Sequence, residues 1–267
     1  MTERSVRLPA VAGMFYPDDP GELRREIDLY LRAAPPSPLP RAPKAMIAPH
    51  AGYIYSGPIA ASAYATLAPA RDTIRTVLLF GPSHRVAFRG IACSSADLFR
   101  TPLGDVPVAH PPLDRLPSSV RIAVHDAAHR QEHGLEVHLP FLQTCLQPGI
   151  QIVPCVVGDA LAEDVAALLD AWWGGDDTLV VISSDLSHYL PYRDAQRIDR
   201  TTTGAIERLD ADAIDFEQAC GRIPIQGLLR VAATRHLHAT TLDLRNSGDT
   251  AGDRHQVVGY GAYAFTA

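Results

Sequence analysis

Short apolar runs alternate with helix-like segments along most of the 267-residue chain, and this alternation constrains the fold more than any other feature. The runs are β-branched or aliphatic and are bounded by turn residues: Ala45–Ala48, Thr76–Phe80, Ile152–Val157 and Leu179–Ser183. Continuous apolar strands separated by helices are typical of a sheet that is buried on both faces and has a parallel core. The sequence therefore predicts an α/β protein with a mostly parallel central sheet flanked by helices.

The segments between these runs carry helical patterns. Asp19-Pro20-Gly21-Glu22 has the residues of a helix start, and the helix it opens should end near Ala34. The other expected helices are Pro58–Leu67, Glu132–Leu146, Leu161–Trp173, Tyr192–Leu209 and Ile225–Leu237. At the end of the chain, the polar loop Arg245–Gln256 joins two runs, His238–Leu244 and Val257–Phe265, which suggests an antiparallel pair. The Pro-rich stretch after Ala34 is short and leads directly into an apolar run, so residues 1–267 are expected to form a single domain.

The charge balance and the cysteine content exclude several classes of protein. With 24 Lys and Arg against 30 Asp and Glu, the net charge is −6, which disfavours binding to nucleic acid or to an anionic membrane. No stretch approaches the roughly 18 continuous apolar residues of a membrane helix, and no secretory signal is visible. The four cysteines include no C-x-x-C pair, which fits free buried thiols in a reducing compartment. We therefore expect a cytoplasmic protein.

Polar side chains follow three of the predicted strands. His50 comes after the first, Ser83 and His84 come after the second, and Ser183-Ser184-Asp185-Leu186-Ser187-His188 comes after the last. In an open α/β sheet, ligands bind outside the carboxyl ends of the strands, so these side chains should share one site. Two imidazoles and a carboxylate are the ligands of non-haem Fe(II), and a further His can act as acid or base.

Three other segments carry weaker signals. His133 and Glu136 are three residues apart and can share a helical face, so they either point into the site or cap and solvate a helix start. Cys220-Gly221-Arg222 is interpreted as a helix C-terminus with Gly. The loop Ser247–Asp253 either binds a cation or polar substrate or is an ordinary hairpin loop. No nucleophile elbow, P-loop or dinucleotide-binding motif is present.

Taken together, the motifs resemble the Memo family, known in prokaryotes as AmmeMemoRadiSam system protein B. The matching pieces occur in order over nearly the whole chain: Arg7–Pro17 (RLPAVAGMFYP), Ala48–Tyr53 (APHAGY) with Ser56-Gly57, Gly81–His84 (GPSH), Glu132-His133 with Glu136, Ser183–Tyr189 (SSDLSHY) and Cys220–Arg222 (CGR). Each piece is short, and their combination and order carry the resemblance.

The resemblance implies a fold similar to that of the class III extradiol (LigB-like) dioxygenases, which hold Fe(II) with two His and a carboxylate. Carried over by motif, His50 and His84 match the metal ligands, and His188 matches the acid/base and is a further candidate ligand. Asp185 would be a catalytic residue that lines the pocket. The remaining candidate pocket residues are Tyr53, Ser83, His133, Glu136, Asp249 and Thr250.

The third metal ligand is the point at which this chain departs from the family pattern. The resemblance to animal Memo proteins implies a Cys in the loop before the last strand, and the equivalent position here lies near Thr250. Because no Cys occurs in that loop, the expected substitutes are Asp249 or Asp253 from the loop, Asp185 or His188, or a water molecule.

Two functions follow as hypotheses. In the first, the protein is a metal-dependent oxidoreductase that uses Fe(II), or else copper or zinc, on a substrate that the sequence does not identify. In the second, the same pocket is a non-catalytic module that binds a peptide, a small anion or a partner protein. The prokaryotic family name further implies association with a radical-SAM protein. This chain has no Cys cluster for an iron–sulfur centre, so it would be the partner of that enzyme.

Overall fold

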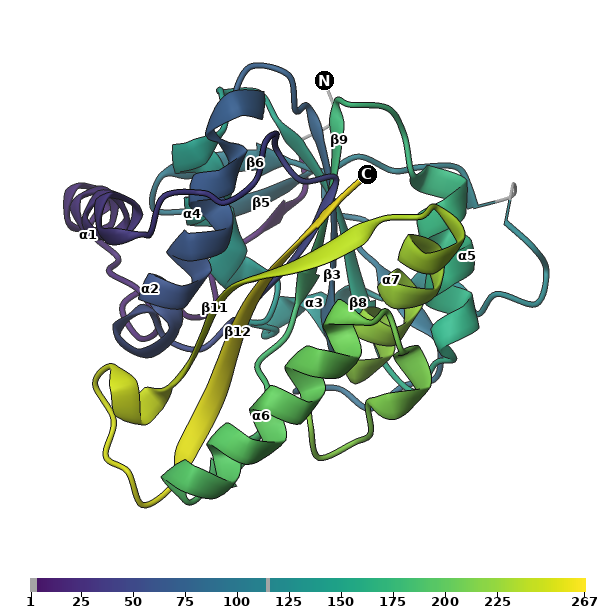
Figure 1. Cartoon of the computed structure of the whole chain (residues 1–267). Helices are drawn as coiled ribbons and strands as arrows, with labels where there is room; N and C mark the ends of the chain where they lie inside the picture. The colour runs from purple at the N-terminus through teal and green to yellow at the C-terminus, as the bar shows by residue number, and fades with distance from the viewer. Residues whose placement is uncertain (1–3, 114–115) are drawn as a thin grey trace.

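The computed structural model describes residues 4–113 and 116–267 of the chain (Figure 1). The strands, in chain order, are β1 (Val6–Arg7), β2 (Ala45–Ala48), β3 (Thr76–Pro82), β4 (Ile91–Cys93), β5 (Leu98–Thr101), β6 (Gly104–Pro107), β7 (Ile122–Val124), β8 (Gln151–Val157), β9 (Thr178–Ser183), β10 (His188–Leu190), β11 (His238–Asn246) and β12 (Val257–Thr266). The α-helices are α1 (Pro20–Ala33), α2 (Tyr53–Tyr64), α3 (Asp126–Arg130), α4 (Leu139–Cys145), α5 (Ala162–Trp172), α6 (Tyr192–Glu207) and α7 (Arg222–Thr234).

The main sheet has nine strands, and its centre is parallel as predicted. Strands β2, β9, β3 and β8 lie side by side, and every pairing among them is parallel. On one side of this centre, β12 pairs antiparallel with β2, β10 and β11. On the other side, β4 pairs antiparallel with β8, and the outermost strand β7 pairs in parallel with β4. The sheet as a whole is therefore mixed. The α/β class, the four central strands and the antiparallel pair at the chain end are confirmed.

Successive side chains of each central strand point to opposite faces of the sheet and pack into two separate hydrophobic cores. On β2, Met46 and Ala48 pack into one core, which α1, α2 and α4 cover, whereas Ala45 and Ile47 pack into the other core, under α5, α6 and α7. Figure 1 shows these two groups of helices on opposite sides of the sheet. This three-layer arrangement explains why the central strands are apolar throughout and do not alternate with polar residues.

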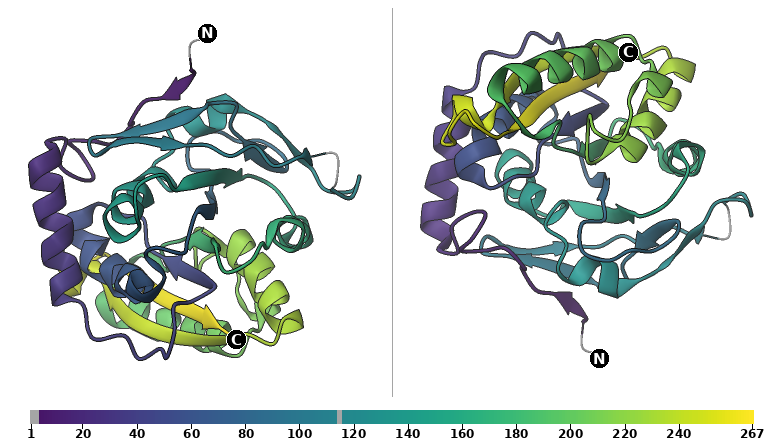
Figure 2. Two further views of the ribbon diagram at one scale, coloured as in Figure 1. Left: turned by 90° about the horizontal axis from the view of Figure 1, so that it is seen from above. Right: turned by 90° about the horizontal axis from the view of Figure 1, so that it is seen from below.

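A second, smaller sheet was not expected from the sequence. It has the order β1-β5-β6, so the N-terminal strand pairs in parallel with a strand some 90 residues later. In both views of Figure 2, the purple strand β1 lies on the side of the molecule that carries the blue-teal strands. The strands β4 to β7 are only three or four residues long, which is too short for a clear period in the sequence.

Two of the expected helices differ from the structure. The helix predicted over 132–146 is a turn followed by a single 3-10 turn at Glu136–His138 and the short α4. The helix predicted over 58–67 begins earlier, at Tyr53, and accommodates Pro58 in its interior. By contrast, the predicted start of α1 is confirmed, because the Asp19 side chain accepts a hydrogen bond from the backbone of Glu22 (2.8 Å). No helix in the described ranges is long and apolar enough to cross a membrane.

Candidate metal centre

The carboxyl ends of β2, β3 and β9 bring three loops together at one edge of the sheet. Residues Ala48 and Ser183 are register partners at the ends of β2 and β9, and β3 runs parallel on the far side of β9. His50 follows β2 and His84 follows β3, and their ring centres lie 5.0 Å apart. The parallel sheet thus places these two imidazoles in contact, although 34 positions separate them in the sequence.

A third imidazole, His133, lies against both. Its ring stacks on His84 with centres 4.5 Å apart and meets His50 edge-on at 5.5 Å. The next residue, Gly134, lies beside both rings: a Cβ there would be in ordinary van der Waals contact with His84 (3.5 Å) and His50 (3.7 Å). Of the two orientations left open for His133, the structure therefore shows the one that points into the histidine cluster.

Cys220 completes a set of three metal-capable side chains, and this residue was misread in the sequence. Its Sγ lies 3.3 Å from Nε2 of His50, and the ligand atoms of His50, His84 and Cys220 all fall within 4.8 Å of one another. The interpretation of Cys220–Arg222 as a helix C-terminus was wrong, because Gly221 instead precedes the first residue of α7. A thiolate donor thus comes from the start of α7 and not from the loop before the last strand.

Gly221 explains how Cys220 reaches the sheet edge. A Cβ at this position would lie 2.6 Å from the carbonyl oxygen of Ser183 and 2.7 Å from Cβ of Ser184. Only glycine permits so close an approach to β9, and its backbone N–H donates to Oγ of Ser184 (2.9 Å). The Cys-Gly pair directly before a helix was the available sequence signal, but it does not show which strand the glycine approaches.

The loop before β12 is held by its own contacts. The carboxylate of Asp249 accepts hydrogen bonds from Tyr192 and from the backbone of Asn246. The Thr250 hydroxyl donates to the carbonyl of Ser247, and Asp253 caps the backbone of His255. Among the described residues, the groups with metal-ligand spacing contain none of Asp249, Thr250 or Asp253.

Glu132 orients His84. One carboxylate oxygen accepts from Nδ1 of His84 (2.8 Å), and the other accepts from the His84 backbone N–H (2.7 Å). Burial alone would raise the pKa of Glu132, but hydrogen bonds and attraction to His84 lower the pKa below its ordinary value. An ionised carboxylate only accepts hydrogen bonds, so Nδ1 of His84 carries the proton and Nε2 keeps a lone pair. Such a carboxylate–histidine pair is typical of metal sites.

Asp185, in the loop after β9, contacts His50, and His188 follows at the start of β10. Asp185 is buried and accepts from the His50 backbone N–H (2.7 Å), and its other oxygen lies 3.9 Å from Nε2 of His50. Burial raises the pKa of Asp185 to about 6. Nδ1 of His188 donates to the carbonyl of Leu186 (2.8 Å), which leaves Nε2 as its lone-pair nitrogen. The next residue, Tyr189, has φ of 58° at an irregular position in the pairing of β10 with β12.

Three further candidate pocket residues have structural partners. Glu136 is fully buried, and its carboxylate binds Arg7, the Tyr16 hydroxyl and two backbone N–H groups of the N-terminal segment. The Tyr53 hydroxyl donates to the carbonyl of Val137 (2.6 Å), and that of Ser83 donates to the carbonyl of Val86 (2.6 Å). In these contacts Glu136 anchors the N-terminal segment and is not one of the cluster's ligand groups.

Burial favours the neutral forms of His50, His133 and Cys220. It lowers the pKa of His50 well below its ordinary value, with the neighbouring His84 and His133 adding to the effect, and lowers the pKa of His133 to about 4. Burial and the charge of Asp185 raise the pKa of the Cys220 thiol. Neutral imidazoles are the metal-binding form, and a divalent ion displaces the proton of a coordinating thiol.

The donor set fits a metal ion. Two imidazole nitrogens and one sulfur suit iron, copper or zinc and suit magnesium or calcium poorly. Nδ1 of His133 is buried and has no hydrogen-bond partner, although the nearest oxygen of Glu132 lies 3.5 Å away. A second group with ligand spacing, His84, Glu132 and His133, overlaps the first at His84. The cluster can thus hold one ion through three protein ligands, which leaves its other coordination positions open.

A cavity of about 480 Å³ opens beside Cys220. Its lining includes Ser83, Phe88, Phe216, Cys220 and Arg222. The guanidinium of Arg222 lies 5.6 Å from the centre of the Phe216 ring, which is 80% exposed. Of the cluster, Cys220 thus borders a cavity whose lining offers both apolar and cationic groups to a ligand.

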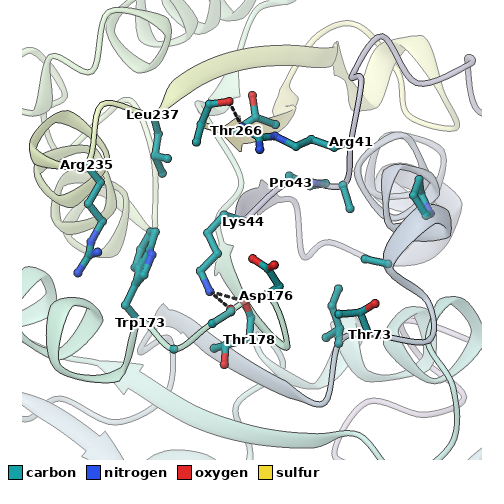
Figure 3. Close-up of a pocket in the computed structure, with 17 residues that line it drawn as sticks. Arg41, Pro43, Lys44, Thr73, Trp173, Asp176, Thr178, Arg235, Leu237 and Thr266 are labelled. Carbon is teal, nitrogen blue, oxygen red and sulfur yellow. Dashed lines mark hydrogen bonds between the residues drawn. The ribbon is translucent and has the colours of Figure 1, made fainter.

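A larger cavity, of about 570 Å³, lies at the opposite edge of the sheet, where β2 and β9 begin (Figure 3). Lys44, the only lysine of the chain, points into it and donates to the carbonyls of Gly175 and Thr178 (2.6 Å each). Its Nζ and the Arg235 guanidinium lie 5.3 Å and 4.6 Å from the Trp173 ring centre. These contacts tie Lys44, the residue before β2, to the start of β9. We therefore assign the polar side chains of this cavity a structural role.

Comparison with known proteins agrees with the motifs. A family model described as Memo-like protein matches residues 7–264. A MEMO1 family protein of Aquifex aeolicus is 36% identical over 96% of this chain and 97% of its own length. MEMO1 family proteins of Methanopyrus kandleri and Sulfolobus acidocaldarius are 36% and 34% identical, and each alignment covers at least 96% of both chains. The chain belongs to the Memo family.

Proposed function

We propose that this protein is a metal-dependent oxidoreductase whose ion is bound by His50, His84 and Cys220. The carrying observation is that the ligand atoms of these three residues lie within 4.8 Å of one another at the carboxyl edge of the sheet. The protein fixes the ligands beforehand: Glu132 holds Nδ1 of His84, and Asp185 holds the backbone of His50. We propose Fe(II) as the resident ion, with copper and zinc as the ions to compare.

A bound Fe(II) ion would supply Lewis acidity and one-electron chemistry at the coordination positions that the protein leaves open. The residues of the chain would do the rest. The cavity beside Cys220 would admit a small substrate or a peptide side chain, and Arg222 would attract an anionic group. His188 would exchange a proton through Nε2, since its Nδ1 is held by the carbonyl of Leu186.

The metal content of tag-free protein, measured by plasma mass spectrometry after anaerobic loading with Fe(II), tests the first part of the proposal. We expect close to one ion per chain in the unaltered protein and background in His50→Ala, His84→Ala and Cys220→Ser. Cys145→Ser is the matched control, because Cys145 is also a free, largely buried thiol but is not part of the cluster. Equal metal in Cys220→Ser and Cys145→Ser would contradict the proposed ligand set.

Oxygen uptake tests the oxidoreductase part. Catechol is added to the iron-loaded protein, and consumption of O₂ should require both the ion and Cys220. A loaded protein that binds catechol, seen as a new charge-transfer band, without consuming O₂ would argue against redox chemistry with this substrate class. Background metal in every variant and in the unaltered protein would instead favour the binding module, in which the same cavity takes a peptide, a small anion or a partner such as a radical-SAM protein.

A further inference from the structure

The hydroxyl of Ser183, at the end of β9, has three polar partners although it carries a single proton. Its Oγ lies 2.6 Å from Nδ1 of His50 and 2.8 Å from Nε2 of His138, and it donates to the carbonyl oxygen of Gly134. A hydroxyl has one proton to donate and two lone pairs that accept. Because the carbonyl can only accept, the proton goes to Gly134. Both imidazole nitrogens must then donate to Ser183.

His138 extends this chain away from the metal cluster. It is buried, and burial lowers its pKa to about 3, so the ring is neutral near pH 7 and has one N–H. With that proton on Nε2, Nδ1 carries a lone pair and accepts from the Tyr64 hydroxyl, 2.8 Å away. Burial raises the pKa of Tyr64, so this hydroxyl keeps its proton. Every donor and acceptor in the chain is satisfied by this one assignment of protons.

We propose that this buried chain of Tyr64, His138, Ser183 and His50 (the Tyr64 chain) fixes His50 in the tautomer with its proton on Nδ1. The lone pair of Nε2 then faces Sγ of Cys220 at 3.3 Å, where the thiol can donate to it. Tyr64, His138 and Ser183 are positioning residues that act through His50. The consequence for metal affinity rests on the proposed function, whereas the tautomer itself does not.

The opposite tautomer is incompatible with these contacts. On the Nε2 side of His50, Sγ of Cys220 can either donate or accept, so the choice between the tautomers is made on the Nδ1 side. The lone pair left on Nδ1 would face Oγ of Ser183, whose single proton is already given to Gly134. These partners satisfy all four side chains without a water molecule. The hydrogen bonds alone therefore select the Nδ1–H tautomer of His50.

Long-range ¹H–¹⁵N correlation spectra of metal-free protein read the tautomer directly. The His50 signals are assigned by their loss in His50→Gln, and the His138 signals by their loss in His138→Gln. We expect His50 as the Nδ1–H form and His138 as the Nε2–H form. Finding His50 as the Nε2–H form in the unaltered protein overturns the proposal, whatever the protein binds.

Ser183→Ala tests the coupling to the metal. It should shift His50 toward the Nε2–H form and weaken Fe(II) binding by about 10- to 100-fold, the range for losing a partner of a metal-bound His. Ser62→Ala, which removes another buried hydroxyl bound to Asp243, is the matched control. An unchanged His50 tautomer together with unchanged affinity in folded Ser183→Ala would refute the role of the chain.

Tyr64→Phe provides a second variant that leaves β9 intact. It removes the donor to Nδ1 of His138, so the His138 signals should change while those of His129, which binds the carbonyl of Ala92, should not. Tyr263→Phe, whose hydroxyl pairs with Thr203, is its control. If unaltered protein shows the expected tautomers but binds no metal, the proposed function fails and the Tyr64 chain stands.

Discussion

The sulfur of Cys220 lies 3.3 Å from Nε2 of His50, although 170 positions separate the two residues. His50 follows the central strand β2. Cys220 precedes helix α7, which covers one face of the same sheet together with α5 and α6. Their contact depends on Gly221, which allows the start of α7 to touch the end of β9. The candidate ligand set is thus assembled from two layers of the fold, and a change in how α7 packs would change its geometry.

Metal binding should release about one proton per ion near pH 7. Burial and the charge of Asp185 raise the pKa of Cys220, so the thiol is protonated before binding and must lose its proton to coordinate. His50 contributes none, because its lowered pKa keeps it neutral. Titration calorimetry in two buffers of different ionisation enthalpy measures the number. Release of no proton would show that Cys220 does not coordinate as a thiolate.

The histidine part of this centre could be predicted from the sequence, but the thiol could not. Parallel strands bring their carboxyl ends to one edge, so three apolar runs that each end in a polar motif were sufficient to bring His50 and His84 together. Cys220 has no such rule, because its place depends on how the segment between α6 and α7 returns to the sheet. Expecting the third ligand near Thr250 placed it in a loop in which the side chains of Asp249 and Thr250 bind backbone groups of the same loop.

The segment around His133 shows why helical spacing misled. The residue pattern suggested one helix over 132–146, but the carboxylates of Glu132 and Glu136 bind backbone groups and hold the chain in a turn instead. This turn places Gly134 beside the rings of His50 and His84. Tertiary hydrogen bonds thus override local propensity at the site, and nothing in the spacing of the residues reveals those bonds.

Glu132→Gln should weaken Fe(II) binding by about 10- to 100-fold and leave the fold intact. The amide oxygen can still accept one of the two hydrogen bonds from His84, but the negative charge that fixes the Nδ1–H form is lost. Glu26→Gln is the control, since Glu26 also accepts a side-chain hydrogen bond, from Tyr30, outside the cluster. Equal affinities for the two variants would mean that Glu132 serves only to hold the turn.

Asp199→Asn should stabilise the protein more at pH 7 than at pH 4. Burial raises the pKa of Asp199 to about 6, above its ordinary value of 3.8, where it accepts from the Ser187 backbone N–H and faces Gly259. A carboxyl whose pKa is raised in the folded state makes its full contribution to the free energy of unfolding below about pH 4. That contribution is lost as the pH rises through about 6, where the buried carboxyl becomes charged. The Asn side chain never becomes charged. Between pH 4 and pH 7 the free energy of unfolding of the variant should therefore rise by at most about 3 kcal/mol relative to that of the unaltered protein.

Urea unfolding at several pH values measures the difference. Asp72→Asn, which changes an exposed carboxyl, should show no trend of this size. A stability difference for Asp199→Asn that stays flat between pH 4 and pH 7 would contradict the raised pKa.

Glu136→Gln should destabilise the protein by about 3–5 kcal/mol, because it leaves the Arg7 guanidinium buried without its counter-charge. Both side chains are at most 6% exposed, and the same carboxylate also holds the backbone of Ala10 and Val11 and the Tyr16 hydroxyl. The N-terminal segment, with β1, should therefore detach first.

Asp105→Asn is the control: it breaks the exposed ion pair with Arg100 and should lower the free energy of unfolding by less than about 1 kcal/mol. Urea unfolding gives both values, and hydrogen exchange at Arg7 to Val11 reports the detachment. If the two variants lose equal stability, the Glu136 carboxylate is not the anchor of the N-terminal segment.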